Sequence, residues 1–357
     1  MKQSGKSVRP ELHSSKKMSR TGLSGPSGEA QFAALPTETV HPRAARIESL
    51  PVRAVVKLLL DEEAFAAKMV ARQATPIAHA AERFAEVIAA GGRVIYAGAG
   101  TSGRLGALDA VELPPTFGTD PAQVVAVIAG GPSALRRAVE GAEDRAAGAG
   151  RALERLGAGP GDLVCAIAAS GVTPFSRAAL VEARRRGAKT IFITCAPPAD
   201  RTLADIVIAI PVGPEVIAGS TRLKAGTATK LVLNAISTAA MVRLGKIYRG
   251  RMIDLRATNI KLRARAVRMV VELGGVDATR AASLLAEARG QVRLALAAAL
   301  LDTPVAEART RLAKSGGNLA SLTPAKQIFS RATRPKQPPG KSKPARKTSS
   351  PAGKARR

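Results

Sequence analysis

The chain contains no tryptophan, and only 3% of its 357 residues are aromatic. Hydrophobic residues nevertheless make up 46% of the chain, so its core must consist mainly of Ala, Val, Leu and Ile. Short aliphatic strands are typical of parallel sheets that are covered by helices on both faces. A chain of this length can form one large domain or two smaller ones.

Cysteine and histidine are also scarce. The two cysteines, Cys165 and Cys195, lie in the apolar runs LVCAIAA and TIFITCA, so we expect two buried thiols rather than a disulfide scaffold. The three histidines offer no suitable base for a Ser/His/Asp triad, and no cluster of His, Cys and Asp has the spacing of a metal site. We therefore expect no metal.

Long apolar runs are missing as well. No segment reaches the ~18 apolar residues of a membrane span, and the N-terminus lacks the apolar region of a signal peptide. We expect a cytoplasmic protein with no membrane segment. A reducing compartment also agrees with two unpaired cysteines.

Acidic residues are outnumbered by basic ones, 27 against 55, which gives a net charge of +28. The excess is concentrated at the ends: residues 331–357 hold ten Lys and Arg and no acid, and residues 1–30 hold six bases against two acids. Both ends are rich in Pro, Ser, Gly and Lys, so we expect disordered tails. Such tails could contact nucleic acid or anionic lipid non-specifically, or only keep the chain in solution. A specific nucleic-acid site is not predicted.

Short apolar strands alternate with helices along the middle of the chain. A helical pattern over residues 44–90 leads into this alternation, and Ala- and Leu-rich helices follow it from about residue 246. The expected strands are 93–98, 123–131, 162–170, 189–196 and 206–212, and the expected helices are 103–112, 133–153, 174–187 and 221–245. Five strands separated by helices predict an α/β fold with a doubly wound, five-stranded parallel sheet flanked by helices, and a small C-terminal helical domain.

These patterns divide the chain into five segments. We expect a basic N-terminal tail, a pair of leading helices, an α/β domain, a helical domain and a basic C-terminal tail. Their boundaries are placed at residues 1–36, 37–90, 91–246, 247–325 and 326–357.

A glycine-rich loop follows the first expected strand, in the stretch RVIYAGAGTSGRLG. Its glycines match the dinucleotide fingerprint G-x-G-x-x-G, but the second strand ends in IAGG and has no acid to bind a ribose. The loop also lacks the lysine of a P-loop, because Arg104 follows its last glycine. Thr101 and Ser102 instead place two hydroxyls at a helix N-terminus, which suits a single phosphate group.

A second hydroxyl-bearing loop follows the third expected strand. Its residues Ser170-Gly171-Val172-Thr173 precede a helix, and both loops should emerge at the carboxyl edge of the sheet. Together they predict a site for a phosphorylated small molecule. A third stretch contains Ser220 and Lys224. Lys224 would add positive charge for a phosphate or carboxylate at the same edge, or it could be a solvated surface residue. Ser220 could simply cap the helix that follows.

Carboxylates are the remaining candidates for acid and base chemistry. Glu112 stands just before two prolines that we expect to end its helix, and the negative end of the helix dipole should raise its pKa and favour a proton donor. An exposed, frayed glutamate is the alternative. Glu140, Glu143 and Asp144 form a second acidic group on the next expected helix, where Glu140 and Glu143 would be one turn apart. The alternative is that this group is only a solvated helix face.

Several long motifs resemble the N-acetylmuramic acid 6-phosphate etherase family, which belongs to the sugar isomerase (SIS) domain group. These motifs are GAGTSGRLGALDAVELPPTFG, VEGAED, AIAASGVTPF and GSTRLKAGTATKLVLNAISTAAMVRLGKIY, and the resemblance covers about residues 37–315. It implies a homodimeric carbon–oxygen lyase of the hydro-lyase class that needs no cofactor. Such an enzyme eliminates D-lactate from the open-chain sugar phosphate and then adds water, giving N-acetylglucosamine 6-phosphate during peptidoglycan recycling.

The resemblance also implies roles for particular residues. The acid/base glutamate falls on Glu112 and the second catalytic glutamate on Glu143, with the identity of the C2 base left open. The chain departs from the family pattern at Leu113, Val172 and Thr229. The expected substrate-binding residues are Gly100, Thr101, Ser102, Ser170, Gly171, Thr173, Ser220 and Lys224.

Other functions remain open for an SIS domain. A non-catalytic phosphosugar-binding regulator is the main alternative, although such a protein would not need both Glu112 and Glu143. A DNA-binding regulator would need an N-terminal helix-turn-helix, which the low-complexity residues 1–36 do not provide. A phosphosugar isomerase would not explain the length of the match.

Overall fold

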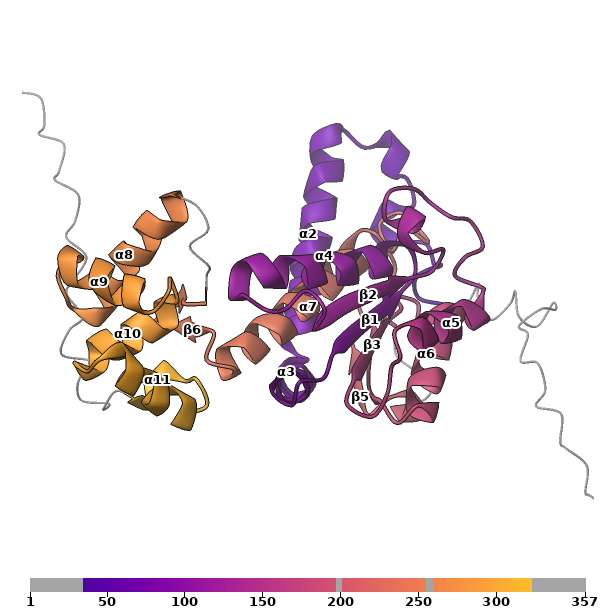
Figure 1. The fold of residues 1–357 in the computed structure, drawn as a ribbon. Coiled ribbons are helices and arrows are strands. Elements are labelled where there is room, and N and C mark those ends of the chain that lie inside the picture. Colours follow the sequence, from indigo (N-terminus) through magenta and orange to yellow (C-terminus); the bar gives the residue numbers. More distant parts are fainter. Residues whose placement is uncertain (1–34, 197–200, 255–259, 323–357) are drawn as a thin grey trace, which may run out of the picture.

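The computed structural model describes residues 35–196, 201–254 and 260–322. Apart from residues 35 and 36, the predicted tails therefore lie outside the described residues. The described chain forms an α/β domain followed by a separate group of helices, which lies beyond the end of the long helix α7 (Figure 1). Both parts were expected from the sequence.

Five parallel strands form the central sheet in the order β2-β1-β3-β4-β5. Gly98 pairs with Ile128 on one side and Ile167 on the other, so the carboxyl ends of the three neighbouring strands are level. The chain runs from β1 outward to β2 and then returns to place β3 on the other side of β1. This reversal is the point where ligands bind in doubly wound folds. The strands are β1 Val94–Gly98, β2 Val124–Ile128, β3 Leu163–Ile167, β4 Lys189–Thr194 and β5 Ile206–Ala209.

Helices cover both faces of this sheet, which confirms the predicted doubly wound architecture. Because successive strand residues point to opposite faces, Tyr96 packs among the helices of one face while Ile95 and Ala97 pack among those of the other. One face carries α2 Val52–Ala71, α3 Ala74–Ala89, α4 Gly100–Phe117 and α7 Lys224–Arg243, and the other carries α5 Ala146–Arg155 and α6 Pro174–Arg185. Short 3₁₀ turns lie at Pro42–Ala44, Ile47–Ser49, Pro132–Leu135 and Arg201–Leu203.

A buried polar network fixes α4 against the sheet. The Tyr96 hydroxyl donates to the Asp109 carboxyl at 2.8 Å, and the Ser237 hydroxyl of α7 donates to the other carboxyl oxygen at 3.1 Å. Burial raises the pKa of Asp109 above its usual range. The two cysteines are free and buried, as expected, in β3 and just after β4.

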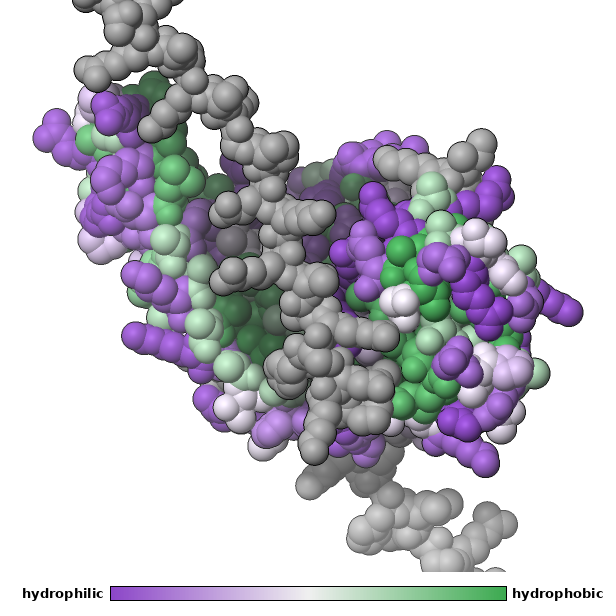
Figure 2. Space-filling model, turned by 90° about the vertical axis from the view of Figure 1, so that its left-hand side faces the viewer, coloured by the Kyte–Doolittle hydropathy of each residue, from purple (hydrophilic) through white to green (hydrophobic). Residues whose placement is uncertain are grey.

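The C-terminal helices have a hydrophobic core of their own. Its centre is α10, most of whose residues are buried. Gly118, at the end of α4, contacts this part of the chain, because a Cβ there would lie 2.5 Å from the Asp254 carbonyl oxygen. Figure 2 shows the side with these helices, where polar residues are widespread and hydrophobic ones gather in patches between them. The elements are β6 Ile247–Tyr248, β7 Arg251–Met252, α8 Ile260–Gly274, α9 Ala278–Glu287, α10 Val292–Leu301, α11 Val305–Lys314 and a 3₁₀ turn Leu319–Leu322.

Helix α4 is longer than expected. We predicted an end at Glu112, but α4 continues through Pro114 and Pro115 to Phe117. Each proline removes one intrahelical N–H, yet the helix persists and ends at Gly118, which adopts a left-handed conformation with φ 64°. The argument that Glu112 feels the negative end of the helix dipole is therefore wrong, since the dipole acts only within the last turn.

The predicted helix over residues 133–153 is also wrong in part. Its N-terminal half is a 3₁₀ turn followed by a loop over residues 136–145, and α5 begins at Ala146. Gly141 has φ +64° in the middle of this loop, which is incompatible with a continuous helix. Glu140, Glu143 and Asp144 consequently lie on a loop and are not spaced by a helical turn.

Candidate functional site

A cavity of about 240 Å³ lies at the carboxyl ends of β1 and β3, where the strand order reverses. Six of the predicted site residues line it: Gly100, Thr101, Ser102, Glu143, Ser170 and Thr173. The other lining residues are Leu35, Glu38, Ala99, Asp144, Ala169, Pro174, Gly219 and Thr221. The two predicted hydroxyl-bearing loops therefore meet at one site, as expected.

The first wall of the cavity is the N-terminus of α4. Its N-cap position is Ala99, whose side chain cannot cap the helix, so the backbone N–H groups of the first turn are left for a ligand. The hydroxyl residues Thr101 and Ser102 line the cavity beside them. A Cβ at Gly103 would lie 2.6 Å from the Gly98 carbonyl oxygen, so glycine is required for the close approach of α4 to β1. This explains the glycine pattern without a dinucleotide.

The second wall is the N-terminus of α6. Thr173 occupies the N-cap position and makes no side-chain capping hydrogen bond. Ser170 and Thr173 both line the cavity, whereas Gly171 does not and instead forms the turn between them with φ 79°. The Phe175 N–H donates to the Glu143 backbone carbonyl at 2.9 Å. That bond holds the acidic loop against the start of α6.

The start of α7 is different, because the protein occupies it with its own carboxylate. Glu215 is fully buried and accepts hydrogen bonds from the N–H groups of Lys224 at 3.2 Å and Ala225 at 2.9 Å. The Lys224 side chain is 2% exposed, and its ammonium lies 2.6 Å from the Glu62 carboxylate of α2. Glu62 also lies 3.2 Å from His41 Nε2. Lys224 therefore does not reach the cavity, and it joins α2 to α7 in place of the expected contact to substrate.

Ser220 lies between two cavity residues, Gly219 and Thr221, but does not itself line the cavity. The departures from the family pattern do not line it either. Leu113 and Thr229 are buried in the core, where the Thr229 hydroxyl donates to the Ala225 carbonyl at 2.8 Å.

Glu38 is a cavity residue that the sequence reasoning missed. The Thr37 hydroxyl donates to its carboxylate at 3.2 Å, and the Gly219 N–H donates to the Thr37 carbonyl at 2.7 Å. A Cβ at Gly219 would lie 3.0 Å from Glu38 Oε2, so the glycine leaves room for the carboxylate. The only sequence signal for Glu38 was its place at the start of the family resemblance, which begins at about residue 37.

The cavity is acidic. Glu38, Glu143 and Asp144 line it, and no lysine or arginine does so among the described residues. Partial burial raises the pKa of Glu143, and the neighbouring charges of Asp144 and Glu140 raise it further. A phosphate here would be bound by backbone N–H groups and hydroxyls at two positive helix ends. Its negative charge would raise the pKa of Glu143 again.

Glu112 lies outside this cavity. It is exposed on α4, ten residues beyond Ser102, which corresponds to about 15 Å along the helix. The same side of α4 exposes Leu108 and Val111, at 39% and 66%. Within one chain, the two predicted catalytic glutamates are therefore not brought together.

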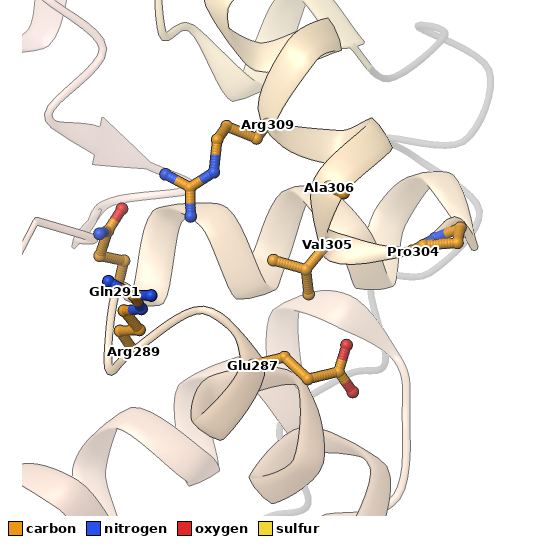
Figure 3. A pocket seen from close by; sticks show the side chains of 7 residues that line it. All are labelled: Glu287, Arg289, Gln291, Pro304, Val305, Ala306 and Arg309. Carbon is orange, nitrogen blue, oxygen red and sulfur yellow. The ribbon is translucent and has the colours of Figure 1, made fainter.

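Two further pockets differ in position. A smaller cavity of about 160 Å³ adjoins the first and shares Ala99, Gly100 and Glu143 with it. A pocket of about 620 Å³ lies among the C-terminal helices and contains no predicted site residue. Figure 3 shows that Arg289, Gln291 and Arg309 lie toward one side of it and Glu287 toward the other. In the described parts of the chain, no group of three or more His, Cys, Asp and Glu could hold a metal ion.

Comparison with known proteins identifies the family. The model of the glucokinase regulatory protein N-terminal SIS domain matches residues 76–183, and the SIS domain model matches residues 152–239. The chain is 46% identical to the N-acetylmuramic acid 6-phosphate etherase of Rhodopirellula baltica over 293 residues, which is 82% of this chain and 97% of its relative. The chain belongs to the N-acetylmuramic acid 6-phosphate etherase family.

A second etherase of the family gives a similar result. The protein of Rubrobacter xylanophilus is 47% identical over 288 residues, which is 80% of this chain and 95% of its relative. Members of the family are enzymes, and the predicted family resemblance is confirmed. Across residues 35–196, 201–254 and 260–322, no helix combines the length and hydrophobicity needed to span a membrane.

Proposed function

We propose that the chain cleaves the lactyl ether of N-acetylmuramic acid 6-phosphate. Elimination of D-lactate followed by addition of water would give N-acetylglucosamine 6-phosphate, so the enzyme would be a carbon–oxygen lyase of amino-sugar catabolism in the cytoplasm. The observation that carries the proposal is the cavity at the β1/β3 switch point, where two uncapped helix starts and the family's glutamate Glu143 meet. Identity of 46% over nearly the whole of a named etherase supports the substrate.

The phosphate of the substrate is bound at the starts of α4 and α6. Backbone N–H groups and the hydroxyls of Ser102, Ser170 and Thr173 supply the donors, and the two helix dipoles supply the positive potential. No cation is needed for this binding mode. The sugar chain then extends along the acidic side of the cavity.

The elimination requires two proton transfers. The C1 aldehyde of the open-chain sugar makes the C2 hydrogen acidic, so a carboxylate can remove it, and the poor alkoxide leaving group at C3 must be protonated as it departs. Glu143 lies in the cavity and its pKa is raised, which brings it nearer to neutral pH and suits proton transfer at C2. Glu112 is assigned to protonation of the ether oxygen and to the later addition of water.

Glu112 can act in this cavity if it comes from a second copy of the chain. The exposed side of α4 that carries it is apolar at Leu108 and Val111, and α7 exposes Leu231 and Val242. Such surfaces are typical of subunit interfaces. We therefore include in the proposal a homodimer in which the partner's Glu112 completes each site.

Mixed dimers test this arrangement. Glu112→Gln and Glu143→Gln chains, each inactive alone, are unfolded together and refolded at equal amounts. If Glu112 acts on the partner's site, half of the dimers are mixed and hold one intact site of two, so about a quarter of wild-type activity should return. No recovery above the separate variants would place both glutamates in one chain.

The main alternative is a phosphosugar-binding regulator without activity. The match of residues 76–183 to the SIS domain of the glucokinase regulatory protein favours it. Incubation of the purified chain with N-acetylmuramic acid 6-phosphate and assay of D-lactate separates the two functions. Tight binding of the sugar phosphate with no lactate released would establish the regulator.

A further inference from the structure

The adjoining cavity of about 160 Å³ has a different lining from the first. It is formed by the loop over residues 138–143 and by Arg104, which follows the phosphate-binding turn on α4. Because the two cavities share Ala99, Gly100 and Glu143, a ligand bound in one can extend into the other past the Glu143 side chain. The remaining lining residues are Ala129 and Ala134.

The charges of the two cavities differ in a way that matters for a doubly anionic substrate. Carboxylates line the first cavity at Glu38, Glu143 and Asp144, with no basic residue among the described ones, so a second negative group is repelled there. The adjoining cavity is lined by the basic residue Arg104 as well as by Glu140 and the shared Glu143. It is therefore the less unfavourable place for a carboxylate.

Arg104 is held in place by the protein. Its Nε donates to the Ala134 carbonyl at 3.0 Å and its Nη2 donates to the Arg137 carbonyl at 3.3 Å. Within the described residues its Nη1 makes no hydrogen bond. A guanidinium fixed in this way can bind a carboxylate with little loss of side-chain entropy.

The geometry points to the adjoining cavity as the subsite for the D-lactyl group, with Arg104 binding its carboxylate and the alanine methyls of the 129–142 region packing on its methyl group. This inference rests on the proposed etherase function. It places the bond that is cleaved at the boundary between the two cavities, with C2 of the sugar beside Glu143.

Ala138→Asp tests the subsite without disturbing Arg104. Ala138 is exposed and lines only the adjoining cavity, so the new carboxylate should repel the lactyl group. We expect the KM for N-acetylmuramic acid 6-phosphate to rise about tenfold, because like charges at close range are strongly unfavourable. The Kd for N-acetylglucosamine 6-phosphate, which lacks the lactyl group, should stay within about twofold of wild type. Ala147→Asp, an exposed alanine on α5 that lines neither cavity, is the matched control.

Three more variants test the charges of this cavity: two at Arg104 should raise the KM, and one at Glu140 should lower it. Arg104→Lys keeps the charge but loses the planar fork, so it should raise the KM less than Arg104→Met does. Glu140→Gln removes a carboxylate from the same cavity and should lower the KM. All three should leave the Kd for N-acetylglucosamine 6-phosphate unchanged.

The outcomes separate this inference from the proposed function. If the wild-type chain releases no lactate, the etherase function fails. If it does release lactate and Ala138→Asp behaves as Ala147→Asp, or if Ala138→Asp weakens both ligands equally, the lactyl subsite lies elsewhere and the inference is overturned.

Discussion

Helices α6 and α7 both begin at the carboxyl edge of the sheet after a short stretch of small and hydroxyl residues, yet only one start is open to a ligand. At α6 the N-cap Thr173 makes no capping bond and lines the cavity. At α7 the first N–H groups are already bound by the buried Glu215. A helix start becomes an anion site only where the protein does not supply the anion itself.

The cavity beside the open start of α6 should carry the chemistry, so Glu143→Gln is the most severe test of the comparison between α6 and α7. We expect turnover to fall by about 10² to 10⁴, the usual contribution of a general acid or base. The Kd for N-acetylglucosamine 6-phosphate should change little, because the phosphate is bound elsewhere in the cavity. Glu82→Gln, which changes an exposed glutamate of α3 that lines neither cavity, is the control. Turnover within tenfold of wild type would remove Glu143 from the mechanism.

The start of α7, which the protein's own Glu215 occupies, should matter for stability. Lys224→Met leaves the Glu62 carboxylate without its ammonium partner, and breaking a buried pair in this way costs about 3–5 kcal/mol of unfolding free energy. Urea denaturation measures the loss, and the double variant with Glu62→Gln should recover part of it. Lys230→Met, which removes an exposed hydrogen bond to Asn234 and a weak attraction to Asp109, is the comparison. An unchanged midpoint together with weaker substrate binding would return Lys224 to the site.

Removal of single hydroxyl groups compares the open helix starts of α4 and α6 directly with the occupied start of α7. Ser102→Ala and Ser170→Ala should each weaken sugar-phosphate binding by about 1–3 kcal/mol, as expected for hydrogen bonds to a charged group. Ser220→Ala should change it by no more than about 0.5 kcal/mol. Calorimetric titration with N-acetylglucosamine 6-phosphate gives all three values. Equal losses at Ser170 and Ser220 would show that α7 also contributes to the phosphate site.

The smallest effect concerns pH. A carboxyl group with a raised pKa in the folded state destabilises the fold once the pH exceeds its unfolded pKa of about 4.3. Glu143→Gln should therefore be slightly more stable than wild type at neutral pH and equally stable below about pH 4. Thermal unfolding across this range measures the difference. If the wild-type chain instead gained stability relative to the variant as the pH rose, the fold would lower the pKa of Glu143 and this prediction would be wrong.

Local sequence signals predicted the open helix starts of α4 and α6, but not the contacts made at the start of α7. The five strands and the loops at Ser102 and Ser170 could be located because their signals lie within a few neighbouring residues. Lys224 was expected in the site because it lies near the same sheet edge, whereas its ion pair with Glu62, 162 residues away, is beyond any local pattern. Glu38 was missed for the same reason, since only the folded chain brings it to Gly219. The end of α4 was misplaced because we expected the two prolines to stop the helix, whereas it continues through both of them to Phe117.

The two buried thiols have a practical consequence for a chain without tryptophan, which offers no indole fluorescence. Burial raises the pKa of Cys195 to about 12 and that of Cys165 still further, so neither forms a thiolate at neutral pH while the sheet is closed. A thiol-specific dye can react only after the strands separate. Its rate of incorporation therefore reports how often the central sheet opens, with no label engineered into the protein.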